Sequence, residues 1–183
     1  KVADGVFEPL SHKNVDTGMG LDRTVATLQG VESVYDTDGF SAIIRRIEEL
    51  SGKTYDNQSE YTRMFRIIAD HMRSSTFLLG DQCGITPSNV DQGYVLRRLI
   101  RRSIRFAMQL GIPDGKLSSV AAAVIDEYGP FYPELMEGRE KILSELDKEE
   151  QRFKGALMKG IKEFERLAAK LEDKHIDGQA AFH

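Results

Sequence analysis

Apolar residues recur every three or four positions over most of this chain, which is the spacing of helices that bury one face. The pattern predicts a helix from the capping residues 36–38 to near Gly52, and further helices over 60–79, 94–110 and 117–128. A longer helix is predicted over 134–174, and its apolar seam should pack on a neighbouring helix rather than form a dimeric coiled coil. The seam consists of Ile142, Leu146, Phe153, Leu157, Phe164, Ala168 and Leu171. The chain is therefore predicted to be mainly α.

The first 34 residues follow a different pattern. Val2, Val6 and Phe7 flank Asp4–Gly5, which predicts a short β segment with a hairpin turn. A glycine-punctuated stretch over 14–20 then leads into a short helix over 21–28. We therefore expect two parts, residues 1–34 and residues 35–183.

Composition narrows the class of protein. The 183 residues are 40% hydrophobic and 30% charged, as expected for one globular domain or for a domain with an attached fragment. No run of about 18 apolar residues occurs, so no membrane span is expected. The single cysteine, Cys83, excludes an internal disulfide and indicates a reducing, cytoplasmic location. The histidines and this cysteine lack zinc-ligand spacing, so no metal site is predicted.

One basic stripe stands out in a chain whose net charge is −4. Its arginines fill an arc of about 140° on the helix over 94–110, opposite an apolar side made of Leu96, Leu99, Ile100, Ile104 and Ala107. The stripe consists of Arg97, Arg98, Arg101, Arg102 and Arg105. It can contact RNA phosphates, or it can pair internally with Asp70, Glu149 or Glu150. We expect both, with the arginines nearest the preceding loop serving the nucleic acid.

A second candidate lies at the glycine turn. Gly18 and Gly20 allow a close approach of the backbone to a ligand, and a helix N-terminus with Arg23 offers donors that match phosphate oxygens. A tight turn beside a surface arginine would give the same pattern.

The neighbouring residues resemble a known family. The run 15–23, Val-Asp-Thr-Gly-Met-Gly-Leu-Asp-Arg, is similar to motif 3 of class II aminoacyl-tRNA synthetases in its alanyl-tRNA synthetase form, with Asp22 where the family usually has Glu. The likeness continues at 35–38, 66–73 and 87–89, and through the arginine-rich run 93–102. It covers most of residues 14–111.

This resemblance implies roles for the glycine turn. Arg23 would bind the γ-phosphate of ATP, and Asp16 would pair with the α-amino group of alanine. Gly18 would shape an alanine pocket with room for only a methyl side chain, and Gly20 would belong to the same ATP- and alanine-binding turn. Residues 1–34 would then be the end of a catalytic domain that uses ATP and Mg²⁺. The family's other catalytic motifs, its zinc site and its editing parts are not among these residues, so the fragment alone is expected to be inactive.

The resemblance also implies that residues 35–183 recognise the acceptor stem of tRNA(Ala). Asn89 would read the G:U wobble pair, and the five arginines would contact the tRNA backbone. From the residues alone, Asn89 can equally be a turn former. Asp70 and His71 are interpreted as structural, because adjacent helical side chains diverge by about 100°. The alternative to a synthetase fragment is a non-catalytic helical module that binds RNA or protein.

Overall fold

The computed structural model describes residues 3–169, 176 and 178. The chain divides into two compact units, Lys1–Thr37 and Asp38–His183. The boundary between residues 34 and 35, and the assignment of the two parts to a catalytic and a tRNA-recognition domain, stay predictions.

The short β segment predicted at the start of the first unit is wrong. The described residues contain no strand, only an isolated antiparallel bridge between Ala3 and Val6; Val2 lies outside them. The tight turn itself is present, with Gly5 at φ 74° and the Val6 N–H donating to the Ala3 carbonyl at 3.0 Å. Val6 and Phe7 are exposed. A single residue pair with no apolar face to bury cannot hold a sheet, which needs three or more strands or a covering helix.

The predicted helix over 21–28 is confirmed as α1, Leu21–Gln29, and a 3₁₀ turn, η1 (Val34–Asp36), follows it. Gly30 ends α1 in the left-handed region at φ 67°, where its N–H reaches the carbonyls of Ala26 and Thr27. A residue with a Cβ is strained in that conformation, so glycine is the usual choice at this position.

The mainly α prediction is confirmed in the second unit. Its helices in the described residues are α2 (Asp38–Ser51), α3 (Thr62–Gly80), α4 (Asp91–Leu110), α5 (Ser118–Tyr128), α6 (Pro133–Glu137) and α7 (Arg139–Ala168). None of the helices in this described part combines the length and apolarity needed to cross a bilayer.

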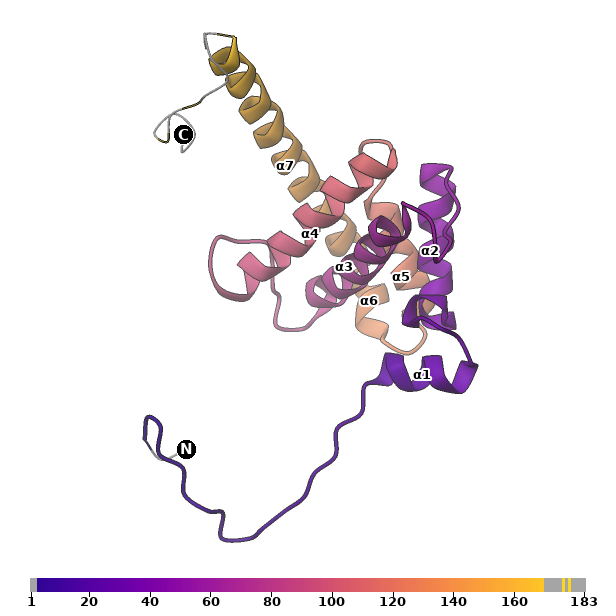
Figure 1. Cartoon of the computed structure of the whole chain (residues 1–183), viewed down its shortest axis with the longest axis vertical. Helices are drawn as coiled ribbons and strands as arrows, with labels where there is room; N and C mark the ends of the chain where they lie inside the picture. The colour runs from indigo at the N-terminus through magenta and orange to yellow at the C-terminus, as the bar shows by residue number, and fades with distance from the viewer. Residues whose placement is uncertain (1–2, 170–175, 177, 179–183) are drawn as a thin grey trace. The chain divides into compact units, whose positions relative to one another are not determined.

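The helices α3 and α4 form the centre of this unit and lie side by side (Figure 1). Apolar side chains from both are fully buried, among them Phe65, Ile68 and Met72 on α3 and Leu96 and Ile100 on α4. Each such side chain contributes about 1.5–3 kcal/mol on burial. The predicted apolar side of the arginine helix therefore does face the core.

The prediction of one unbroken helix over 134–174 is wrong. It is two helices, α6 and α7, which meet at Gly138 with φ −84° and ψ 1°. Gly80, the last residue of α3, lies against this junction: a Cβ there would come within 2.7 Å of a Leu135 methyl carbon. The break lets the short α6 turn back over the end of α3, which a straight helix could not do. Residues 170–174 lie outside the described residues.

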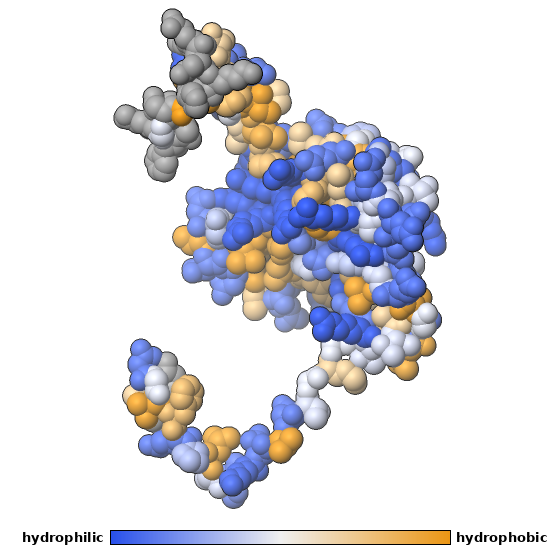
Figure 2. Space-filling view, in the orientation of Figure 1, coloured by the Kyte–Doolittle hydropathy of each residue, from blue (hydrophilic) through white to orange (hydrophobic). Residues whose placement is uncertain are grey.

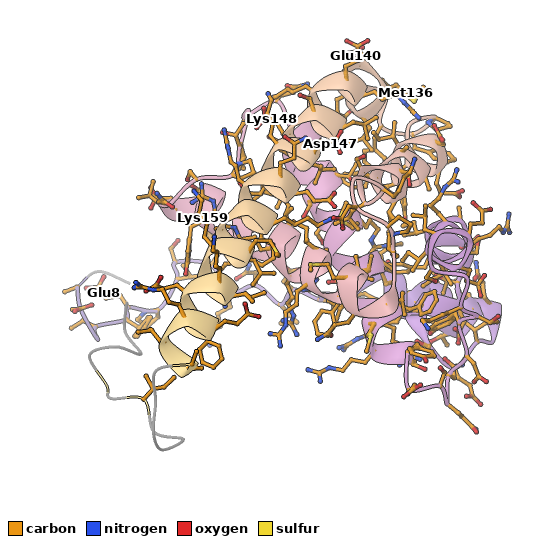
Figure 3. The ribbon with its side chains drawn as sticks, turned by 90° about the horizontal axis from the view of Figure 1, so that it is seen from above. Glu8, Met136, Glu140, Asp147, Lys148 and Lys159 are labelled. Atoms are coloured by element: carbon orange, nitrogen blue, oxygen red, sulfur yellow. The ribbon has the colours of Figure 1, made fainter. Side chains whose placement is uncertain are left out.

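Only the first half of α7 packs on the bundle. Ile142 and Leu146 are buried, whereas Phe164 is 58% exposed, and Leu171 lies outside the described residues. The outer half of α7 extends away from the other helices (Figure 1). Figure 3 shows the same helix from above, with Lys148 on its packed half and Lys159 further along. The predicted seam is thus a packing surface at its start and is open to solvent further along.

Candidate nucleic-acid interface

The five arginines of α4 divide into two groups according to what they contact. Arg97 and Arg101 turn towards α7 and are partly buried, while Arg98, Arg102 and Arg105 are exposed. Figure 2 shows hydrophilic residues over much of the visible face of this unit, with hydrophobic residues grouped at its lower left. The stripe therefore has an inner, paired edge and an outer, open edge.

The inner edge is held by a buried carboxylate. Glu149 of α7 has a side chain only 1% exposed, and its Oε1 lies 2.7 Å from Arg101 Nε and 3.5 Å from Arg97 Nε. The Arg101 guanidinium also lies over the Phe153 ring, 5.4 Å from its centroid. Of the three acids proposed as internal partners, Glu149 takes this role. Glu150 instead accepts from Lys154 and from the Gly115 N–H.

The outer edge is not ion-paired in the part of the chain that the structure describes. Within the described part of the chain, no carboxylate lies at ion-pair distance from Arg98, Arg102 or Arg105. Arg98 lies 5.8 Å from the centroid of the Tyr94 ring. Arg102 and Arg105 line a surface concavity of about 560 Å³ whose other lining residues are Glu60, Arg63, Met64, Phe106 and Gln109. Such a concentration of unpaired guanidinium groups favours a polyanionic partner.

Arg63 also lines this concavity and was not among the residues predicted from the sequence. Arg63 lies in the first turn of α3, which has neither an acidic residue nor a side-chain cap. A basic residue is disfavoured at the positive end of a helix, and this mismatch is the local signal that singles it out.

Asn89 lies in a loop that folds back on the start of α4. The Ser88 N–H donates to the Gly93 carbonyl at 3.0 Å, and the Ser88 hydroxyl donates to the Val90 carbonyl at 2.9 Å. A Cβ on Gly93 would approach the Thr86 carbonyl oxygen to 2.5 Å, so only glycine lets the loop pack this closely against the start of α4. The side chain of Asn89 is exposed, and its Oδ1 accepts a hydrogen bond from Arg97 Nη1.

Asp70 and His71 form a pair with each other. Asp70 Oδ2 lies 2.8 Å from His71 Nδ1, and the His71 side chain is 13% exposed. Their predicted structural role stays a prediction.

Cys83 lies in the loop before Asn89 and is exposed. Hydrogen bonding and the negative charge of Asp81 raise the pKa of the Cys83 thiol above its usual value. A raised pKa leaves less thiolate at neutral pH, as expected of an unreactive loop cysteine.

The glycine turn of the first unit, residues 14–20, is a solvent-exposed segment without regular secondary structure. Asp16 Oδ1 accepts from the Thr17 N–H at 2.8 Å, and no neighbouring atom lies within 4 Å of a Cβ added at Gly18. Gly20 is the N-cap of α1, and Arg23 projects from its first turn. Asp16, Gly18, Gly20 and Arg23 are all exposed. Gly20 and Arg23 thus lie at the N-terminus of α1, whereas Asp16 and Gly18 lie in the exposed segment before it.

Backbone N–H groups at a helix N-terminus and an arginine in the first turn are groups that can bind a phosphate, and α1 has both. Mg²⁺ is a different case. Over the described ranges, no group of three or more His, Cys, Asp or Glu side chains could hold a metal ion. The described residues therefore supply no complete magnesium site.

Comparisons with protein-family models and with curated proteins point to the same family. The family model for class II (A) tRNA synthetases matches residues 1–183. The chain is 49% identical to the alanine–tRNA ligase of Treponema pallidum and 48% identical to that of Borreliella afzelii, in each case over 100% of this chain and 31% of the relative. It is 44% identical to the alanine–tRNA ligase of Thermotoga petrophila over 98% of this chain and 20% of the relative. The chain thus spans less than a third of the length of these relatives, and it belongs to the class II alanyl-tRNA synthetase family.

Proposed function

We propose that this chain supplies motif 3 and the acceptor-stem binding region of an alanyl-tRNA synthetase. The complete enzyme would work in the cytoplasm, activate alanine with ATP and Mg²⁺, and transfer it to tRNA(Ala). The observation that carries this proposal is the outer edge of α4, where Arg98, Arg102 and Arg105 are exposed and no carboxylate among the described residues pairs with them, on the helix that follows the Asn89 loop. The family model covers the glycine turn as well as the helices, which favours a synthetase part over a stand-alone binding module.

Arg98, Arg102 and Arg105 are the proposed contacts to the tRNA backbone. They lie on one side of α4, and an acidic protein with a net charge of −4 attracts RNA only where such a local patch exists. Phosphate contacts would position the tRNA, and Asn89 would specify the G:U pair through base contacts. Arg97 and Arg101 support this surface from within, because both are partly buried and paired with the carboxylate of Glu149.

The salt dependence of RNA binding tests the outer edge. Each arginine that contacts a phosphate should contribute about 0.7–0.9 to the slope of log K against log salt. Replacing Arg98, Arg102 and Arg105 together by Gln should therefore make the slope shallower by about two to three units, equally for G:U and G:C stems. Fluorescence anisotropy with an acceptor-stem RNA at several salt concentrations measures this. Arg45→Gln, an exposed arginine on α2, is the matched control; a triple variant with the slope of this control would contradict the proposed contacts.

The proposed role of Arg23 concerns adenylate formation. A guanidinium at the start of α1 would neutralise a phosphate of ATP as charge develops in the transition state. In the complete synthetase, Arg23→Ala should slow alanine-dependent ATP–pyrophosphate exchange by about a hundredfold or more, on the scale of a lost electrostatic donor. RNA binding should not change. Exchange at the wild-type rate would show that this turn is not motif 3.

A further inference from the structure

The amide of Asn89 has a defined orientation. Arg97 Nη1 donates to Asn89 Oδ1, and Arg97 Nη2 lies 3.5 Å from the Pro87 carbonyl oxygen of the same loop. An arginine side chain carries only donors, so the atom of Asn89 that faces Arg97 must be the oxygen. The nitrogen of the amide is then left for partners outside the protein.

Arg97 is itself held from behind. Its side chain is 17% exposed, and its Nε lies 3.5 Å from Oε1 of the buried Glu149, an ion-pair distance at which Nε makes no hydrogen bond in the described structure. Because the guanidinium is planar and rigid, an acid beside Nε favours the orientation in which the two terminal nitrogens reach the loop. A carboxylate on α7 thereby fixes a loop that lies about sixty residues earlier in the chain.

We propose that Glu149 and Arg97 form a positioning relay that orients Asn89 for reading the tRNA base pair. Arg97 is in this account a positioning residue and not a phosphate contact. The relay rests on the proposed function, because it matters for specificity only if Asn89 is a reader. It explains why a surface asparagine on a loop can have the fixed geometry that base discrimination requires.

Packing alone does not account for the buried acid. A buried ion pair is a poor way to gain stability, since apolar residues of the same volume often serve as well. Glu149 also keeps Oε2 buried without a hydrogen bond in the described structure, an arrangement that carries a further cost. A role in orienting Arg97 gives this costly arrangement a function.

Arg101 provides a matched comparison within the same helix. It lies one turn from Arg97 and shares the same Glu149 oxygen, but its other contact is the Phe153 ring on α7 and not the Asn89 loop. Removing either guanidinium disturbs the same buried carboxylate. Only the removal of Arg97 should release Asn89.

The experiment compares Arg97→Gln, Arg97→Lys and Arg101→Gln in the complete synthetase. The readouts are the ratio of kcat/KM for charging G:U-bearing over G:C-bearing tRNA, the melting temperature, and ATP–pyrophosphate exchange. Both Arg97 variants should lower the ratio by about threefold to tenfold, the range expected for the loss of one hydrogen bond. The lysine variant keeps a charge beside Glu149 but lacks the planar fork that reaches the loop. Arg101→Gln should lower the melting temperature as Arg97→Gln does and leave the ratio unchanged.

The outcomes separate the relay from the proposed function. Equal losses of discrimination in the Arg97→Gln and Arg101→Gln enzymes would overturn the relay, since the effect would then follow the stability of the ion pair. An Asn89→Ala enzyme with reduced discrimination beside Arg97 variants with the wild-type ratio would overturn the relay alone. If Asn89→Ala also kept the wild-type ratio, the proposed function itself would fail.

Discussion

Replacing Glu149 by alanine should lower the free energy of unfolding of the helical unit by about 3–5 kcal/mol. The carboxylate is 1% exposed and is the shared partner of two guanidinium groups, so its removal leaves both without an acid. Arg101 is 36% exposed and can recover some hydration, which places the expected loss towards the lower end of this range. Urea unfolding of the purified chain, followed by circular dichroism, measures the change.

Glu145→Ala is the matched control for this experiment. Glu145 lies one turn earlier on α7 and pairs with Lys148, whose side chain is 53% exposed (Figure 3 shows Lys148 on this helix). Such a pair contributes about 0–1 kcal/mol. If Glu149→Ala unfolded at the same urea concentration as Glu145→Ala, the inner edge of α4 would not depend on Glu149 for its stability.

The helices of the second unit were predictable because their pattern is local. In α4, apolar residues at helical spacing and a stop at Gly111 and Pro113 are enough to indicate the element. The predicted start at 94 was three residues late, because Asp91 begins the helix at φ 49°, an unusual conformation for a non-glycine residue. The break at Gly138 depends on the packing of α6 over the end of α3, and the spacing of apolar residues along the chain carries no information about that tertiary contact.

The candidate site was predictable only in part. Helical spacing places the five arginines on one side of α4, but it does not predict which of them form an ion pair with a carboxylate. That division is set by Glu149, which lies 48 residues from Arg101 along the chain and meets it only through tertiary packing. The contact between Arg97 and Asn89 likewise depends on the return of the loop at Gly93. At the glycine turn, Gly18 faces open space in the described unit, so the local pattern cannot specify the walls of an alanine pocket.

Replacing Asn89 by alanine should reduce the charging of G:U-bearing tRNA by the complete synthetase about tenfold or more. Loss of an amide that contacts a base edge costs about 1–3 kcal/mol of discrimination, on the scale known for base contacts in DNA. The side chain is exposed, and its protein partner is Arg97, which remains paired with Glu149 in the variant. The loop keeps its Ser88–Gly93 hydrogen bond, so the fold and adenylate formation should be little changed.

A purely structural role of Asn89 leads to a different set of results. If the residue served only to hold the loop, its replacement would lower the melting temperature and reduce charging of every tRNA together. Ser88→Ala is a suitable control, because it removes the hydroxyl that closes the same loop at Val90 and leaves Asn89 in place. It should affect stability more than discrimination.

The ratio of kcat/KM for G:U-bearing over G:C-bearing tRNA, measured for wild-type and Asn89→Ala synthetase, is the most direct test of a tRNA-reading surface at the start of α4. ATP–pyrophosphate exchange and the melting temperature are measured on the same preparations. We expect the ratio to fall about tenfold, on the scale of a lost base contact, while exchange and melting temperature stay at their wild-type values. A variant that keeps the wild-type ratio, or one in which all three quantities fall together, would contradict the assignment of Asn89 as the reader.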